Sequence, residues 1–389
     1  MTFSADCSNM LVDGKEDALG VGVPRIHSVR TGLARTKIEL NGRELIHFGS
    51  NDYLGLAADP RIVAALTEAV RQYGWGSTAS PSVGGRGVLH EQLEQRLASF
   101  VDAEAVILYS SGYAANLDAI RELVGEGDAI FCDDQNHISI LDGAKLSGAA
   151  VYPYRHGDCD HLSSLMQAGR HHRRRLIATE SLFGSDGSLA SLQDLAEIAE
   201  RHDAMLFVDE AHAIGTQGNR GEGAAATLGH RDCLVARVGT LGKALGGMGG
   251  FVAGRTSLVK ALATRPRGYQ HSTSLPAAAC AAALAAVEII VGEPDRRAVL
   301  FERASGVRGE LLRQGWNVRT SASHIIPVWI EDARRAEAIA ASLRDTGFYL
   351  PCVVPPHAAA GRSMLRLRIN CGHEPEVIEG LLSSFARSA

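Results

Sequence analysis

The sequence predicts an α/β protein with a large, mostly parallel sheet, followed by a smaller α/β unit. Seven short apolar runs between residues 104 and 254 alternate with stretches that have helical spacing, such as Leu192, Leu195 and Ile198. This alternation favours crossover helices and a parallel sheet that is covered on both faces. The pattern changes after about residue 277, which predicts a second unit.

The seven predicted strands cover residues 104–110, 128–133, 149–154, 175–180, 204–209, 234–239 and 249–254. No internal repeat or low-complexity block interrupts them. We therefore expect a seven-stranded sheet in a large domain over residues 57–290.

The C-terminal part has a different order of elements. Alanine-rich and amphipathic stretches over 277–314 predict long helices. Further strands are predicted at 322–330, 348–354 and 363–370, with helices near 333–345 and after Glu374. This order predicts a small α/β domain with an antiparallel sheet over 291–389.

The N-terminal part is predicted to form an arm over residues 1–56. Its segment IELNGRELIHF is typical of a hairpin that turns at Asn41-Gly42. The first 20 residues contain acids and have no apolar core, so we do not expect a secretory signal.

Composition narrows the function classes. Of the 389 residues, 46% are hydrophobic and 21% charged, as in ordinary globular proteins, and no apolar run is long enough to predict a membrane span. A net charge of −5 gives no general attraction to nucleic acid. The seven cysteines are scattered without a CxxC pair, which favours reduced thiols in a cytoplasmic protein. No histidine–carboxylate set has metal-ligand spacing, so we expect no metal.

Two predicted strands end in residues that carry chemistry. Asp209 and His212 follow the run AMLFVD, and Lys243 follows LVARVG in the segment TLGKALGG. Ligands of open α/β sheets bind beyond the carboxyl ends of the strands. An amine that can form a Schiff base, an acid for a pyridinium nitrogen and small residues for close approach are what pyridoxal phosphate (PLP) requires. A single lysine at the end of a strand is more often a surface charge. The prediction of a PLP site therefore depends on Lys243, Asp209 and the small residues occurring together.

The phosphate of such a cofactor needs hydrogen-bond donors. Ser111, Gly112 and Tyr113 lie where the strand ILYS passes into a helix, and free N–H groups at a helix start bind anions. An ordinary strand-to-helix turn with a serine cap explains the same residues, and Tyr113 either approaches the ring or merely packs. Ser272 and Thr273, before Pro276, form a second hydroxyl cluster or simply cap the next helix.

Motifs in a particular order extend over nearly the whole chain. They are SNDYLGL (50–56), SSGYAAN (110–116), NHISILDG (136–143), VDEAHAIGTQG (208–218), TLGKALGG (240–247), STSLP (272–276) and LRLR (365–368). In this order they resemble the α-oxoamine synthases, a family of fold-type-I PLP-dependent transferases. The resemblance implies that fold and PLP as the cofactor.

The resemblance also implies individual roles around the cofactor. Lys243 would be the Schiff-base lysine and later move the α-proton of the substrate. Asp209 would pair with the pyridinium nitrogen, and His212 would hydrogen-bond the ring hydroxyl. His137 would stack on the ring. Without the resemblance, both histidines would be interpreted as structural residues.

The implied phosphate contacts come from two subunits. Thr240 and the turn at 111–113 would hold the phosphate within one chain. Ser272 and Thr273 would reach it from a second copy, which implies a homodimer with shared active sites.

The implied substrate contacts are Asn51 and Arg366, the latter holding the amino-acid carboxylate through its bidentate fork. Alternation along the segment MLRLRIN puts Leu365 and Leu367 on one face of a strand and both arginines on the other. We expect Arg368 to be a surface arginine.

Three segments depart from the family pattern. Gly184 stands where relatives commonly have serine in F-S-M-D-G. His357 lies in a stretch that replaces P-T-V-P-x-G, and residues 80–85 lack the S-R-x-x-x-G pattern. These changes affect the prediction of the substrate more than that of the cofactor.

The expected reaction is decarboxylative condensation of an amino acid with an acyl-CoA or an acyl carrier protein thioester to give an α-aminoketone. The first expectation within the family is the 8-amino-7-oxononanoate synthase reaction of biotin biosynthesis, with L-alanine and a pimeloyl thioester. Alternatives within the family are 2-amino-3-ketobutyrate CoA ligase, 5-aminolevulinate synthase and a synthase of secondary metabolism. An aminotransferase and a non-catalytic scaffold subunit are more distant alternatives, and the presence of Lys243, Asp209 and His212 argues against the scaffold.

Overall fold

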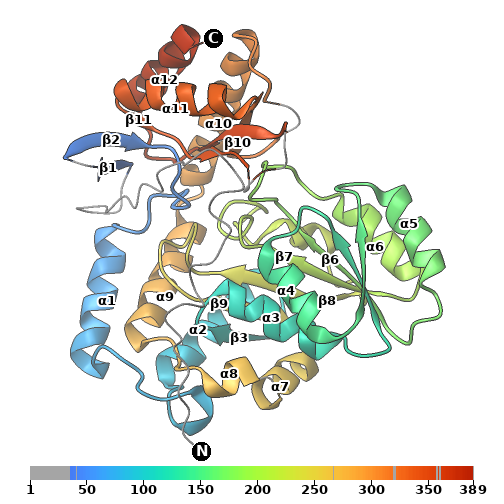
Figure 1. Ribbon diagram of the computed structural model, residues 1–389. Coiled ribbons are helices and arrows are strands. Elements are labelled where there is room, and N and C mark those ends of the chain that lie inside the picture. The colour runs from blue at the N-terminus through green and yellow to red at the C-terminus, as the bar shows by residue number, and fades with distance from the viewer. Residues whose placement is uncertain are drawn as a thin grey trace, which may run out of the picture.

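The computed structural model describes residues 36–40, 42–265, 267–318, 321–355, 358 and 361–388. The expectations for the first 35 residues, including the lack of a secretory signal, lie outside this range. Figure 1 shows a large α/β body and a smaller C-terminal layer of helices and short strands beside it.

The large body is built on a seven-stranded sheet, and every predicted strand is present in it. The strands are β3 (Ala105–Tyr109), β4 (Ala129–Asp133), β5 (Ala150–Tyr154), β6 (Arg175–Glu180), β7 (Met205–Asp209), β8 (Leu234–Thr240) and β9 (Gly250–Gly254). Their order is β3-β9-β8-β7-β6-β4-β5. Strand β9 runs antiparallel to the other six strands, which all point the same way, so the predicted mostly parallel sheet is confirmed.

Helices cover both faces of this sheet because the central strands are apolar on both sides. One face packs against α3 (Gly112–Leu123), α4 (Ile138–Ser147) and α7 (Thr256–Thr264). The opposite face packs against α5 (Cys159–Ala168) and α6 (Leu192–Arg201). Neighbouring residues such as Ile130 and Phe131 therefore enter different cores.

Four more helices complete this body. Near β3 and β9, α2 (Val88–Val101) and α9 (Ala277–Gly292) lie over the sheet, and α1 (Pro60–Tyr73) packs against α9. The short helix α8 (Arg267–His271) lies beside α7. No single helix in the described ranges is long and apolar enough to cross a membrane. Helix α9 and the following helix α10 (Asp295–Arg313) meet the length and composition required only when taken together, with a 74° bend between them.

The C-terminal part contains a three-stranded antiparallel sheet and three long helices. The sheet has the order β10-β13-β12, with β10 at Ile325–Glu331, β13 at Ser363–Arg368 and β12 at Cys352–Val353. The helices are α10 (Asp295–Arg313), α11 (Ala333–Asp345) and α12 (Pro375–Ser388). The predicted helices of this part are present, as are the predicted strands at 322–330 and 363–370. The strand predicted at 348–354 is instead divided into β12 and a separate short strand at Phe348–Tyr349, which belongs to another sheet.

The predicted N-terminal hairpin is present as β1 (Lys37–Leu40) and β2 (Arg43–His47). Gly42 has a φ of 75°, the left-handed conformation that tight hairpin turns need. The hairpin pairs with β11 (Phe348–Tyr349), so segments about 300 residues apart in the chain share one sheet.

The parallel strands carry their polar residues to one edge of the large sheet. Strand β6 ends at Glu180, β7 at Asp209 and β8 at Thr240, and the first residues of α3 follow β3. Glu180 and Asp209 are direct partners in the register of β6 and β7. The sheet topology therefore gathers these side chains where α/β proteins bind ligands.

Candidate active site

A cavity of about 450 Å³, partly open to solvent, lies at this edge of the sheet. Its size falls within the usual range for small-molecule sites. It is lined by Gly112, Tyr113, Asn116, His137, Ser139, Glu180, Asp209, Ala211, Thr240 and Lys243. Six residues singled out from the sequence therefore meet around one space, although they come from four separate segments.

Asp209 is a buried carboxylate held from two sides. Its Oδ2 accepts a hydrogen bond from Asn116 Nδ2 at 2.7 Å, and its Oδ1 accepts one from the backbone N–H of Ala211 at 2.8 Å. Only 4% of its surface is exposed. Such contacts fix the direction of the carboxylate, as a partner for a cationic ring nitrogen requires.

Lys243 lies within hydrogen-bond distance of His212, with 2.8 Å between Nζ and Nε2. Burial lowers the pKa of Lys243 to about 8, although the charges of Asp209 and Glu180 act in the opposite direction. A lysine with this pKa is partly neutral near physiological pH, and the neutral amine is the form that attacks an aldehyde.

His212 is oriented by a chain of hydrogen bonds from the SNDYLGL segment. Tyr53 donates its hydroxyl proton to Asn51 Oδ1 at 3.0 Å, and its oxygen lies 2.7 Å from His212 Nδ1. Burial and the charge of Lys243 lower the pKa of His212 well below its usual range, so the ring is neutral. Nδ1 then carries the proton and donates to Tyr53, which leaves Nε2 as an acceptor that faces Lys243.

His137 lies at the start of helix α4 and is exposed at the cavity. Its Nδ1 is 2.7 Å from Ser139 Oγ, and that hydroxyl accepts from Asn116 at 2.8 Å. The backbone N–H of His137 donates to Glu180 Oε1 at 2.8 Å. One network thus orients the carboxylate of Asp209 and the ring of His137 together.

The start of helix α3 lies at the same cavity. Ser111 caps the helix by accepting a hydrogen bond from the N–H of Ala114 at 3.1 Å. A Cβ on Gly112 would lie 3.4 Å from the Cβ of Thr240, so the two segments approach closely. The hydroxyl of Thr240 accepts from the N–H of Gly242 at 3.1 Å and donates to the carbonyl of Gly249 at 2.9 Å. Backbone donors of α3 therefore lie beside Thr240, in the cavity that contains Lys243.

Tyr113 is 42% exposed, and its hydroxyl donates to Asp142. Its place in the cavity lining favours a role beside the ligand over simple core packing.

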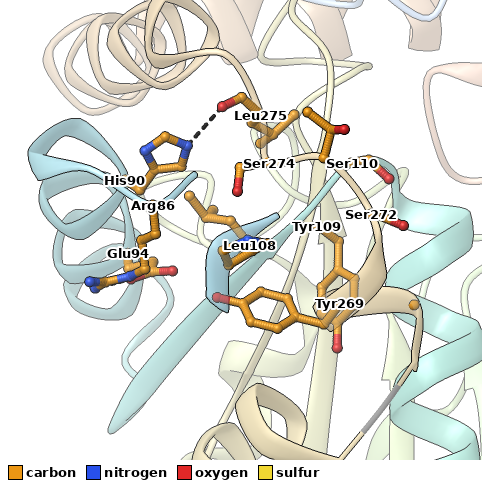
Figure 2. A pocket seen from close by; sticks show the side chains of 13 residues that line it. Arg86, His90, Glu94, Leu108, Tyr109, Ser110, Tyr269, Ser272, Ser274 and Leu275 are labelled. Atoms are coloured by element: carbon orange, nitrogen blue, oxygen red, sulfur yellow. Dashed lines mark hydrogen bonds and ion pairs between the residues drawn. The ribbon is translucent and has the colours of Figure 1, made fainter. Parts of the chain in front are cut away.

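Ser272 and Thr273 line a different cavity, shown in Figure 2, together with Ser110 and Tyr269. In that cavity His90 is hydrogen-bonded to the carbonyl of Leu275.

The two arginines of strand β13 lie on the face predicted from the alternation, and Leu365 and Leu367 are fully buried on the other. Arg366 donates to the carbonyl of Gly184 at 3.1 Å, and burial lowers its pKa to about 10. The expectation of a surface position for Arg368 is wrong. It is half-buried, its Nε lies out of reach of solvent, and Nη1 donates to the carbonyl of Gly49 at 2.8 Å.

Comparisons with known proteins agree with this geometry. The family model for class I and II aminotransferases matches residues 43–385. The chain belongs to this family. An 8-amino-7-oxononanoate synthase from Anaeromyxobacter dehalogenans (strain 2CP-1) is 44% identical over 349 residues, which cover 90% of this chain and 87% of that protein.

Solved structures extend the similarity to the whole fold. A serine palmitoyltransferase with its PLP internal aldimine has a TM-score of 0.89 at 30% identity, covering 93% of this chain and 92% of that one. An 8-amino-7-oxononanoate synthase from Francisella tularensis has a TM-score of 0.77 at 27% identity, covering 88% and 97%. The predicted fold-type-I architecture and the resemblance to the α-oxoamine synthases are thereby confirmed, and the chain is a PLP-dependent enzyme of that type.

The residues of this family member fit PLP. Asp209 supplies a fixed anion, Lys243 a partly neutral amine and His137 an exposed ring. The α3 turn beside Thr240 supplies donors for a phosphate. The Oδ1 of Asn116 and the Nε of Arg366 are buried without a hydrogen-bond partner among the described residues, which suits a site that is completed by bound molecules.

The departure at Gly184 has a steric reason in this family member. A Cβ built on Gly184 would lie 2.1 Å from Nε2 of His212 and within 3 Å of two more atoms of its ring. The imidazole therefore occupies space that a side chain at residue 184 would need. Of the segment that contains His357, residues 356, 357, 359 and 360 lie outside the described part of the chain.

Four residues of the site were not assigned roles from the sequence: Tyr53, Asn116, Ser139 and Glu180. Glu180 had the same signal as Asp209, an acid at the end of a buried strand, and it is the neighbour of Asp209 in the sheet. Burial and the charge of Asp209 raise the pKa of Glu180 to about 8. Asn116 and Tyr53 lie within family motifs, but only the folded chain shows which polar groups they contact.

Proposed function

We propose that the protein condenses L-alanine with a pimeloyl thioester and releases carbon dioxide and a free thiol, the reaction of 8-amino-7-oxononanoate synthase. The observation that carries the proposal is the 44% identity to a synthase of that name over 90% of the chain. The donor is pimeloyl-CoA or the corresponding acyl carrier protein thioester. The cavity around Lys243 and Asp209 supports the chemistry.

When bound, PLP supplies an electron sink for negative charge that develops at the α-carbon of the amino acid. Asp209 would hold the protonated ring nitrogen, and its hydrogen bonds from Asn116 and Ala211 fix the direction of the carboxylate. His212 would accept a hydrogen bond from the ring hydroxyl through Nε2, because its Nδ1 is engaged by Tyr53. His137 would cover one face of the ring.

Lys243 would hold the cofactor, and its amine would move the proton at the α-carbon of L-alanine. Its pKa of about 8 suits this work, because a base is most effective when its pKa lies near the working pH. The same amine would return a proton to that carbon after carbon dioxide has left.

Arg366 would bind the carboxylate of L-alanine through two parallel hydrogen bonds. Its donor bond to the carbonyl of Gly184 fixes one edge of the guanidinium and leaves the others for the substrate. Asn51 would assist from the opposite segment. Holding the carboxylate in this way also orients the bond that breaks when carbon dioxide leaves.

The active unit in this proposal is a homodimer. Ser272 and Thr273 line a cavity separate from that of Lys243, which fits a role toward the phosphate site of a partner chain. Sedimentation at assay concentration tests this, and a fully active monomer would rule it out. A cytoplasmic location is also proposed, in keeping with six free cysteine thiols in the described ranges.

A second candidate is acyl transfer to L-serine. The likeness to serine palmitoyltransferase, with a TM-score of 0.89, favours it, but the identity to that enzyme is 30% against 44% for the synthase. Transfer to glycine, as in 2-amino-3-ketobutyrate CoA ligase and 5-aminolevulinate synthase, remains an outcome of the same assay.

The test is a matrix of L-alanine, glycine and L-serine against pimeloyl-, acetyl-, succinyl- and palmitoyl-CoA, with release of free thiol as the readout and the aminoketone identified by mass. The proposal expects the highest kcat/KM for L-alanine with pimeloyl-CoA. A higher value for any other pair replaces the proposed substrates with that pair. Transamination without thiol release would remove the chain from the synthases.

A further inference from the structure

The described part of the chain has a second cation beside the proposed carboxylate clamp. Arg368 follows Arg366 by two residues on β13, and both lie on the same face of the strand. Their backbones are fixed, since the N–H of Arg366 donates to the carbonyl of Pro351 and that of Arg368 to the carbonyl of Phe48. The strand therefore holds two guanidinium groups toward one region.

Neither guanidinium has a carboxylate partner among the described residues. The acceptors that they reach are the backbone carbonyls of Gly184 and Gly49, and the Nε of each is buried without an acceptor. Partly buried charges are normally paired, because desolvation is costly. Two adjacent, unpaired guanidiniums with unused donors therefore indicate that an anion binds there.

The charge of Arg368 acts on the catalytic groups. Burial affects the pKa of Lys243 most, followed by the charges of Asp209 and Glu180. The charge of Arg368 comes next and has a larger effect than that of Arg366. The charge of Arg368 also affects the pKa values of Tyr53 and His212 more than the charge of Arg366 does. Arg368 thus lies near the reacting groups and not on an outer surface.

A single carboxylate cannot pair with the guanidinium groups of both Arg366 and Arg368 in the bidentate way. Its two oxygens match one guanidinium fork, and Arg366 would bind the carboxylate of the amino acid. Because the charge of Arg368 also acts against that of Arg366, a second anion relieves repulsion that a single anion leaves.

His324 lies near the second arginine. It is fully buried, its ring is 4.1 Å from that of Tyr53, and both of its ring nitrogens lack a partner in the described structure. It precedes Ile325, the cross-strand neighbour of Arg368. A buried imidazole without a partner beside an unpaired guanidinium is a further sign that a polar ligand completes this region.

We propose that Arg368 binds a second substrate carboxylate, distinct from the one that Arg366 holds. The inference rests on the proposed function: since L-alanine has a single carboxylate, the second is the free terminal carboxylate of a dicarboxylic acyl donor. Arg368 then selects an acyl thioester that ends in a carboxylate over one of equal length that ends in a methyl group.

The experiment compares the parent holoenzyme with Arg368→Gln, using pimeloyl-CoA and heptanoyl-CoA, which have the same number of acyl carbons. The variant should lose about 10- to 100-fold in kcat/KM with pimeloyl-CoA, the size of one charge-assisted contact, and far less with heptanoyl-CoA. Arg368→Lys should recover part of the preference. Arg334→Gln, which removes an exposed charge on α11, should keep the parent preference.

Equal losses with both donors, or a rise in the KM of L-alanine without a change in donor preference, would overturn the proposal. L-aspartate and L-glutamate with heptanoyl-CoA test the other source of a carboxylate. If Arg368→Gln lowers kcat/KM only with L-aspartate or L-glutamate, Arg368 still binds a second carboxylate, but that carboxylate belongs to the side chain of the amino acid. If the parent uses no pimeloyl-CoA, the proposed function fails separately. The inference is then decided by the preference between dicarboxylic and monocarboxylic donors of the length that the enzyme accepts.

Discussion

Replacing Asp209 with asparagine removes one charge from the centre of the site and changes the volume little. The carboxylate accepts bonds from Asn116 Nδ2 and from the N–H of Ala211. An asparagine has one acceptor oxygen, so one of these two donors would face an NH2 group. The unfolding free energy should fall by about 1–3 kcal/mol, the cost of a buried donor without an acceptor, and the fold should remain.

The same change should shift the titration of Lys243. Burial lowers the pKa of this lysine to about 8, and Asp209 is the strongest of the charges that raise it. Without that charge the pKa falls further, so the neutral amine is present at lower pH. The rate at which the apoenzyme captures PLP should therefore rise with pH through a midpoint near 8 in the parent and through a lower midpoint in Asp209→Asn.

Catalysis should suffer far more than stability. A neutral partner no longer favours the protonated ring nitrogen, and we expect a loss of about 10²- to 10⁴-fold in kcat/KM for thiol release, or about 3–5 kcal/mol. Glu180→Gln is the matched control, because Glu180 pairs with Asp209 in the sheet and also raises the pKa of Lys243. Glu180→Gln should lower the pH midpoint of PLP capture but reduce kcat/KM for thiol release less than Asp209→Asn does.

Two results would refute this reasoning. Turnover of Asp209→Asn within a few-fold of the parent would mean that the carboxylate does not serve the ring nitrogen. An unchanged or raised pH midpoint would mean that its charge does not act on Lys243.

The remaining predictions concern three other residues. Lys243→Ala should bind PLP weakly without the yellow absorption and without borohydride trapping; a trapped adduct at another lysine would relocate the site. Arg366→Lys keeps the charge but loses the fork, so the KM of the amino acid should rise about 10-fold or more with an unchanged cofactor spectrum, and a parent-like KM would show that this arginine is not the clamp. Gly184→Ala places a Cβ 2.1 Å from Nε2 of His212, and urea denaturation should show a loss of about 1–3 kcal/mol, whereas an unchanged midpoint would show that the ring moves freely.

The sequence alone predicted the fold because each element has a local cause. Alternation of apolar runs and helical spacing was enough for all seven strands of the large sheet, and the Asn41-Gly42 turn was enough for the hairpin. Asp209 and Lys243 were identified because they lie at or just after the ends of predicted strands, where α/β sheets bind their ligands. The order of the motifs then predicted PLP as the cofactor and the α-oxoamine synthases as the family.

Tertiary structure decided the contacts between residues that are distant in the chain. The tautomer of His212 depends on Tyr53, 159 residues away, and the direction of Asp209 depends on Asn116, 93 residues away. Period-two alternation placed Arg366 and Arg368 on one face, but whether that face met solvent or other parts of the chain depended on how β13 packs beside Gly49 and Gly184. The periodicity of a sequence predicts which residues share a face of a helix or strand. Burial and pairing depend on what that face packs against, and only the assembled fold contains that information.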